Sequence, residues 1–394
     1  MIYFDNGATS FPKVPGMSRV MKECIDRYCG NPGRSGHAMS VKTGEEVYRA
    51  RKSVAKVFGI KDPGRLVFTS NTTTALNMGI RGVLGSGDHA VTTAMEHNSV
   101  LRPLRALEDE GVSSSIVSCE SCGRADPQAI TGAIRENTRL VVMAHASNVT
   151  GTLQDIESVG HMIWKINENR DPENRILFII DGAQSAGCVP IDVDELKIDL
   201  LAVPGHKGLL GPLGTGALYV REGVNIYPTI AGGTGTASKE REQPLDFPEG
   251  FEAGTVNAPG IIGLGYSAEW VMKCGVEKIR KYEEELISPL QEALLEMRNV
   301  RVYGPRYCES KTAVVTFNIA SGAGPARLGC EEVSDILARE YGIATRGGYH
   351  CAGLAHKTIG TWDTGAVRLS AGPFNTRKEI KTAIDAIFKI SKMI

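Results

Sequence analysis

The sequence has no excess of either charge and no hydrophobic run long enough to cross a bilayer. Its 394 residues include 44 Lys and Arg against 45 Asp and Glu, a net charge of −1. This balance gives no electrostatic argument for binding nucleic acid or an anionic membrane. No apolar stretch approaches the roughly 18 to 20 residues of a membrane span, and the start shows no secretory signal. We therefore expect a cytoplasmic protein whose partners are small molecules or other proteins.

A disulfide framework is also missing. The nine cysteines are an odd number scattered through a long chain, which is typical of reduced thiols. Cys119 and Cys122 have the spacing of a redox pair or of half a zinc site, but no second pair completes four ligands. We expect no structural metal.

The composition, with 42% apolar residues, 23% charged residues and 45 glycines, is typical of a soluble α/β enzyme. Seven short apolar runs alternate with helical patterns, and their continuous hydrophobicity indicates strands buried on both faces. This predicts a mostly parallel seven-stranded sheet with helices on both faces. The runs cover residues 65–69, 89–93, 115–118, 140–144, 176–180, 200–203 and 216–220.

A second, smaller α+β domain is predicted near the C-terminus, because a chain of this length exceeds what one core usually supports. From about residue 260 the pattern becomes long helices with few strands, and a capping box from Thr376 to Glu379 starts the last helix. We expect a large domain at 15–258. The small domain takes residues 1–14 and 259–394.

The most informative pair is Lys207, in a glycine-framed run, and Asp181, at the end of an apolar strand. In parallel sheets, ligands bind at the carboxyl ends of strands. A lysine there can form a Schiff base, and a carboxylate can keep a pyridine nitrogen protonated, as a pyridoxal phosphate site requires. A surface lysine and a turn aspartate are the alternative when each residue is taken alone.

Other polar residues after the strands complete such a site. Thr72 and Thr73 open a helix, where backbone amides and hydroxyls favour a phosphate. His97 can lie on the cofactor ring, and Asn148 and Gln184 can donate to its phenolate oxygen. Threonine capping and a satisfied core histidine remain the ordinary structural alternatives.

Near the C-terminus, Cys351 lies among Arg346, His350 and several glycines. Such neighbours can lower the pKa of a thiol and favour the nucleophilic thiolate, whereas an inert buried thiol is the usual alternative. Further on, Arg368 ends a strand, and its guanidinium suits bidentate capture of an amino acid's carboxylate.

Together these motifs resemble the class V aminotransferase family, and within it the cysteine desulfurase and selenocysteine lyase branch of the fold type I pyridoxal phosphate-dependent transferases. The resemblance extends from Asp5 to Arg368. Its motifs are residues 31–37, 96–97, 145–151, 181–184, 205–207, 251–255 and 346–352.

The resemblance implies a role for each motif. Lys207 carries the cofactor, Asp181 pairs with its pyridine nitrogen and His97 stacks on its ring. The implied phosphate ligands are Thr73 and His206, with Thr255 contributed by the other subunit of a homodimer. The implied substrate contacts are Arg34, His37, Arg346 and Arg368.

The implied activity is conversion of L-cysteine to L-alanine by a pyridoxal 5′-phosphate-dependent cysteine desulfurase. Cys351 matches the cysteine that takes up the sulfur as a persulfide for an acceptor protein, and its compact loop looks like that of the second type of desulfurase. A selenocysteine lyase would use the same residues. Two further alternatives are an aminotransferase and a catalytically silent scaffold of the same fold. The motifs argue against both, because an aminotransferase does not need the thiol and a scaffold does not need the intact catalytic residues.

The chain departs from the family pattern at Pro204, where relatives often carry a hydroxyl residue that helps to bind phosphate. Phosphate then depends more on Thr72, Thr73, His206 and Thr255, so we expect weaker cofactor retention. A second histidine beyond the cysteine, at position 356, has no role that the sequence assigns.

Overall fold

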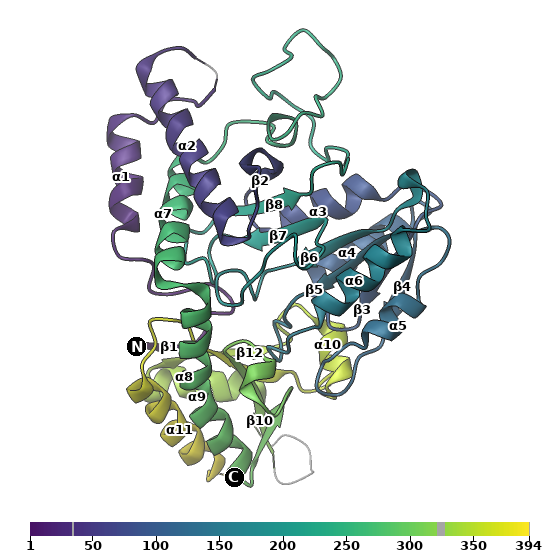
Figure 1. Ribbon diagram of the computed structural model, residues 1–394. Coiled ribbons are helices and arrows are strands. Elements are labelled where there is room, and N and C mark those ends of the chain that lie inside the picture. The colour runs from purple at the N-terminus through teal and green to yellow at the C-terminus, as the bar shows by residue number, and fades with distance from the viewer. Residues whose placement is uncertain (34, 321–327, 394) are drawn as a thin grey trace.

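The computed structural model describes residues 1–33, 35–320 and 328–393. Figure 1 shows a larger lobe built on the longest sheet, and a smaller lobe that contains both ends of the chain. No helix within these residues is both long and apolar enough to cross a bilayer.

The large lobe contains a seven-stranded sheet in the order β2-β8-β7-β6-β5-β3-β4. Within the described chain, β8 is antiparallel to both of its neighbours and the other strand pairs are parallel. The predicted mostly parallel sheet is therefore confirmed. Its strands are β2 (Leu66–Thr69), β3 (His89–Thr93), β4 (Ser113–Val117), β5 (Thr138–Ala144), β6 (Leu177–Asp181), β7 (Leu200–Pro204) and β8 (Gly216–Val220).

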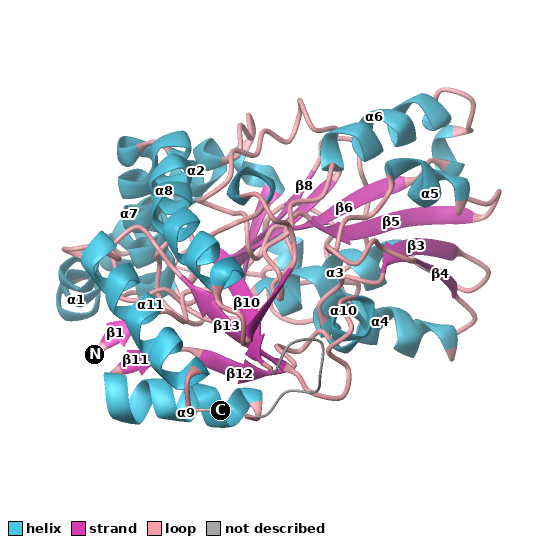
Figure 2. Cartoon of the chain, turned by 90° about the horizontal axis from the view of Figure 1, so that it is seen from below, coloured by secondary structure: helices cyan, strands magenta, loops and turns pink. Residues whose placement is uncertain are grey.

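Helices cover both faces of this sheet, as the continuous apolar runs predict. Phe178 and Ile180 of β6 pack in one apolar cluster, and Leu177 and Ile179 pack in another, because alternate side chains leave a strand on opposite faces. Figure 2 shows α5 and α6 on one side of the sheet and α3 and α4 on the other. The bounds are α1 (Met17–Arg27), α2 (Ala38–Val57), α3 (Thr72–Val83), α4 (Asn98–Glu108), α5 (Pro127–Gly132), α6 (Ile156–Asn167) and α7 (Ala258–Cys274).

The small lobe is built on an antiparallel sheet in the order β12-β13-β10-β9. The first strand of the chain also belongs to this lobe, where β1 and β11 pair in parallel as a separate two-stranded sheet. The expected capping box of Thr376 and Glu379 starts α11. The strands are β1 (Ile2–Tyr3), β9 (Val300–Tyr303), β10 (Val314–Ile319), β11 (Ile343–Ala344), β12 (Arg346–Gly348) and β13 (Ala366–Ser370). The helices are α8 (Val276–Glu296), α9 (Cys330–Tyr341), α10 (Gly353–Thr358) and α11 (Arg377–Ser391).

The division into two domains stays a proposal, and the apolar clusters give it a sharper form. Ile261 and Leu264 of α7 pack in the cluster of the large sheet, whereas Leu286 and Leu290 of α8 pack with the small sheet. Between the two helices, Gly275 has φ +86°, a conformation that glycine adopts without strain. We propose that the small domain takes the N-terminal strand and begins again at α8.

A buried carboxyl group lies where the two lobes meet. Glu283 of α8 is 5% exposed and lines a cavity of about 430 Å³ together with Lys207 and Ser370. Burial raises the pKa of Glu283 to about 8, because the cavity solvates a carboxylate poorly. In the unfolded chain the same group titrates near its ordinary value of about 4.3.

Replacing Glu283 with glutamine is expected to flatten the pH dependence of stability. Between about pH 4.5 and 8 the folded state keeps a proton that the unfolded state has lost, so stability falls as the pH rises. We expect the free energy of unfolding of the wild type to fall by roughly 2 to 4 kcal/mol over this window because of Glu283. In Glu283→Gln this contribution is absent. Urea unfolding at pH 5 and pH 8 measures this free energy for each protein. Glu277→Gln, an exposed change on the same helix, is the control, and equal pH dependence in all three proteins contradicts the prediction.

Candidate active site

Most of the predicted cofactor-binding residues meet at one end of the large sheet, where parallel strands finish. There the chain surrounds a cavity of about 520 Å³. Eight of the residues expected from the sequence line it, although they come from five separate strand ends. They are Thr72, Thr73, His97, Asn148, Asp181, Gln184, His206 and Lys207.

One wall of the cavity is suited to an anion. It is formed by the first turn of α3, where the Asn71 side chain caps the helix by accepting from the Thr74 amide at 2.9 Å. Thr72 Oγ1 and His206 Nδ1 are buried and have no hydrogen-bond partner among the described residues. Buried polar atoms of native proteins are nearly always paired, so these two indicate a ligand.

His97 is held at the start of α4, where its Nδ1 accepts from the Ser99 amide at 3.0 Å. Burial lowers the pKa of His97 to about 4, and the neighbouring charges of Lys207 and Arg346 act in the same direction. The ring is therefore neutral at pH 7, with its orientation set by the capping bond. Ser99 was not expected from the sequence, and its hydroxyl also contacts Thr73 Oγ1 at 2.7 Å.

Asp181 and Lys207 lie on neighbouring strand ends. Asp181 is 4% exposed, and its Oδ1 accepts from the Ala183 amide at 2.8 Å. Burial raises the pKa of Asp181 and lowers that of Lys207 to about 8, while the attraction between the two charges opposes both changes. A lysine with this pKa has an appreciable neutral fraction at pH 7, which is the form that attacks an aldehyde.

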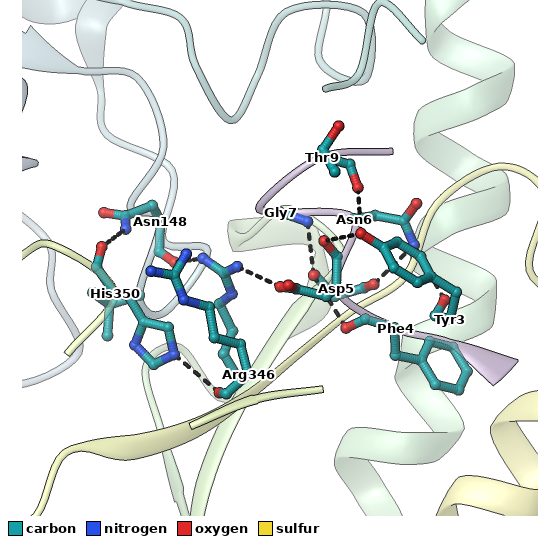
Figure 3. A network of polar contacts seen from close by, with 12 residues as sticks. Tyr3, Phe4, Asp5, Asn6, Gly7, Thr9, Asn148, Arg346 and His350 are labelled. Atoms are coloured by element: carbon teal, nitrogen blue, oxygen red, sulfur yellow. Dashed lines mark hydrogen bonds and ion pairs between the residues drawn. The ribbon is translucent and has the colours of Figure 1, made fainter. Parts of the chain in front are cut away.

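Two arginines reach the site from the small sheet. Arg346 of β12 and Arg368 of β13 are directly opposite in the antiparallel pair, so their side chains leave the sheet on the same face. Arg368 is 1% exposed and forms an ion pair with Asp5 Oδ1 at 2.8 Å. It also donates to the Asn148 carbonyl at 2.9 Å, and its Nε is buried without a partner among the described residues. Figure 3 shows Asp5 and Asn148 on opposite sides of this network.

Cys351 lies in the short connection between β12 and α10, and its side chain is exposed. Arg346 Nη2 is 3.9 Å from its sulfur. The connection docks on the large lobe at two points. Asn148 Nδ2 donates to the His350 carbonyl at 2.6 Å (Figure 3), and the Asn98 amide donates to the Cys351 carbonyl at 2.9 Å. The thiol is therefore tied to the residues that line the cavity.

Comparison with known proteins identifies the family. The model of the class V aminotransferases matches residues 2–382. The chain belongs to the class V aminotransferase family. A probable cysteine desulfurase of Methanothermobacter thermautotrophicus is 32% identical over 399 residues, which cover 100% of this chain and 95% of the relative. The cysteine desulfurase IscS of Photobacterium profundum is 31% identical over 408 residues, covering 98% and 91% of the two chains.

Solved structures agree with this assignment. The apo structure of a cysteine desulfurase from Thermococcus onnurineus NA1 has a TM-score of 0.89 at 32% identity, covering 100% of this chain and 95% of that one. The cysteine desulfurase CsdA from Escherichia coli has a TM-score of 0.84 at 26% identity, with the same coverage. The fold is thus that of the fold type I enzymes, as expected.

Class V aminotransferases depend on pyridoxal 5′-phosphate, and this chain offers what that cofactor requires. The unpartnered Thr72 hydroxyl and His206 ring nitrogen suit its phosphate, at a helix N-terminus that favours negative charge. Asp181 offers a buried carboxylate for a protonated pyridine nitrogen, and Lys207 offers the amine.

Two predicted site residues, His37 and Thr255, lie elsewhere. His37 is exposed and caps α2, accepting from the Ser40 amide at 3.3 Å. Thr255 is exposed too, and neither residue lines the cavity of its own chain. Arg34 is outside the described residues. The sequence analysis gave no role to Glu96, which is buried in this structure. Its carboxyl group accepts hydrogen bonds from the Thr93 hydroxyl and the Ala144 amide, and burial raises the pKa of Glu96 to about 8.

Pro204 ends β7 two positions before His206, and it does not line the cavity. We expect Pro204→Ser to tighten cofactor binding, lowering the Kd about fivefold, which is the contribution of roughly one neutral hydrogen bond. Titration of the cofactor-free protein with pyridoxal phosphate measures the Kd. Pro204→Ala restores the backbone amide without a hydroxyl, so an equal gain in that variant assigns the effect to the amide. No gain in either variant means that Pro204 does not weaken cofactor retention.

Proposed function

We propose that this protein is a pyridoxal phosphate-dependent cysteine desulfurase, which converts L-cysteine to L-alanine and retains the sulfur as a persulfide on Cys351. The observation that carries the proposal is the docking of the Cys351 connection on the cavity of Lys207, through Asn148 and the first turn of α4. An aminotransferase has no need of a thiol at that position. The names of the relatives support the same activity.

Each residue of the cavity then has a part in holding cofactor and substrate. Thr72, Thr73 and His206 would hold the phosphate, and Asp181 would pair with the pyridine nitrogen. Bound pyridoxal phosphate supplies an electron sink that accommodates negative charge at the substrate's α-carbon. The amide groups of Asn148 and Gln184 stand at the same cavity as donors for the phenolate oxygen.

The substrate's carboxylate is bound by Arg368, whose guanidinium is already oriented by Asp5 and the Asn148 carbonyl. Once its amine is free, Lys207 takes the α-proton, since its pKa of about 8 lets it accept and return a proton near pH 7. The neutral ring of His97 is available to move the same proton.

Sulfur transfer then falls to Cys351. Its thiolate attacks the substrate's sulfur, so that an S–S bond forms while the bond between that sulfur and the β-carbon breaks. The electron pair of the broken bond stays on the β-carbon, which takes up a proton and becomes the methyl group of alanine. The guanidinium of Arg346, 3.9 Å from the Cys351 sulfur, attracts the anionic nucleophile.

The proposed assembly is a homodimer in which Thr255 and His37 contribute to the partner's site. Both are exposed and lie away from their own cavity, which supports a contribution across an interface. Large apolar side chains are exposed on neighbouring parts of the sequence, as a buried interface requires. They include Tyr48 at 52%, Tyr227 at 74%, Ile230 at 54% and Leu245 at 54%. The persulfide passes to an acceptor protein, and the free thiols agree with a cytoplasmic location.

The first test is to record the visible absorbance of the purified protein and then add L-cysteine under a reductant. We expect bound cofactor and equal amounts of alanine and sulfide. Bound cofactor without alanine formation contradicts the proposed substrate, and turnover of L-selenocysteine under the same conditions then indicates a selenocysteine lyase. Protein that binds no cofactor contradicts the proposal altogether.

A further inference from the structure

Behind the cysteine, three buried side chains form a chain of hydrogen bonds that the proposed mechanism does not use. His350 is 2% exposed, His356 of α10 is 0% exposed and Thr361 is 1% exposed. His350 Nε2 is 3.1 Å from the Arg346 carbonyl, and its Nδ1 is 3.2 Å from His356 Nε2. His356 Nδ1 is in turn 2.7 Å from Thr361 Oγ1.

The two rings meet edge to edge in one plane. Their centroids are 5.4 Å apart with an interplanar angle of 15°. This separation is close to the largest that a 3.2 Å contact between ring nitrogens permits, so the N–H of one ring points along the lone pair of the other. The contact between His350 and His356 is therefore a well-aligned hydrogen bond.

Only one placement of protons satisfies this chain. The Arg346 carbonyl can only accept, so His350 Nε2 carries a hydrogen and its Nδ1 is a bare acceptor. His356 Nε2 must then donate, which leaves His356 Nδ1 to accept from the Thr361 hydroxyl. Burial keeps both rings neutral, lowering the pKa of His350 to about 3 and that of His356 to about 4.

The chain of hydrogen bonds supports a strained turn. His350 has φ +51° and Cys351 has φ +58°, both in the left-handed region that residues with a β-carbon rarely adopt. Two such residues in succession are strained and persist only where their surroundings hold them. The carbonyls of both are held by the large lobe, and the His350 ring is the anchor on the other side.

We propose that His356 and Thr361 are positioning residues for persulfide formation. They fix the orientation of the His350 ring, and this ring holds Cys351 in the left-handed conformation that places its sulfur 3.9 Å from Arg346 Nη2. Neither residue touches the substrate. The inference rests on the proposed desulfurase activity, and it adds that the rate of attack by Cys351 depends on a side chain five positions away, since correct placement of a nucleophile contributes strongly to rate.

The test compares His356→Leu with His356→Gln, whose side-chain amide can still donate to His350 Nδ1. Two rates are measured on the cofactor-loaded protein: single-turnover persulfide formation on Cys351 with L-cysteine, and exchange of the α-proton of L-alanine in D2O. Exchange needs Lys207 and the cofactor but not the thiol. We expect His356→Leu to slow persulfide formation at least about tenfold with exchange unchanged, and His356→Gln to recover most of the rate.

Thr361→Val and Thr361→Ser form a second pair for the case that His356→Leu does not fold. We expect the valine variant to slow persulfide formation and the serine variant to restore it, because only serine keeps the hydroxyl that sets the tautomer. Persulfide rates within twofold of wild type in the leucine and valine variants overturn the proposal. So does an equal loss of both rates, since that is a general structural effect. Exchange without any persulfide in the wild type contradicts the desulfurase activity itself.

Discussion

Lys207→Ala is expected to abolish cysteine turnover, with kcat falling at least about 10³-fold. The amine has two tasks, to bind the cofactor's aldehyde and to move the α-proton, and loss of a proton-transferring group alone typically costs 10² to 10⁴ in rate. No other amine lines the cavity within the described residues. Alanine formation measures the rate, and mass spectrometry after borohydride reduction measures cofactor attachment.

The matched control is Lys13→Ala. Lys13 is also near the site, where its ammonium donates to the His206 carbonyl at 2.9 Å, and burial lowers its pKa to about 8 as well. We expect the Lys13 variant to keep the covalent cofactor and the Lys207 variant to lose it. If covalent attachment survives in Lys207→Ala and disappears in Lys13→Ala, the cofactor is bound to Lys13 and the assignment to Lys207 is wrong.

Cys351→Ala is expected to stop sulfur transfer while leaving the earlier steps intact. Alanine formation from L-cysteine falls about 10³-fold or more, because among the described residues no other thiol lines the cavity or lies in the Cys351 connection. Exchange of the α-proton of L-alanine continues, because Lys207 and Arg368 are unchanged. Selenium release from L-selenocysteine falls less, since selenium leaves carbon more easily. The exposed Cys29 provides the control variant Cys29→Ala, which keeps full activity.

The contrast between the two variants separates the two halves of the mechanism. Lys207→Ala loses both exchange and sulfur transfer, whereas Cys351→Ala loses sulfur transfer alone. Cysteine turnover that persists in Cys351→Ala shows that Cys351 is not the nucleophile.

The residues at the strand ends were predictable because each follows a continuous apolar run. Asp181 and Lys207 each come at or just after a strand, and parallel strands bring such ends together. The side chains that form hydrogen bonds and ion pairs with the site residues could not be predicted from such local patterns. Asp5 binds Arg368 across 363 positions of sequence, and such a pairing leaves no local pattern.

The same reason accounts for the missed role of His356. Its hydrogen bond to His350 depends on both rings being buried in one plane, which spacing alone does not reveal. The predicted domain boundary, between residues 258 and 259, stands at the start of α7 because α7 and α8 resemble one helical stretch in the sequence. The break at Gly275 is a single residue with a positive φ.

The brevity of the connection that carries Cys351 limits how far its sulfur can travel. Only residues 349–352 separate β12 from α10, and the carbonyls of His350 and Cys351 are both tied to the other lobe. A longer, free loop could swing a persulfide outward to meet a distant recipient. Here the two tied carbonyls limit that movement, so under the proposed mechanism the recipient has to come to the exposed sulfur at the place where the persulfide forms.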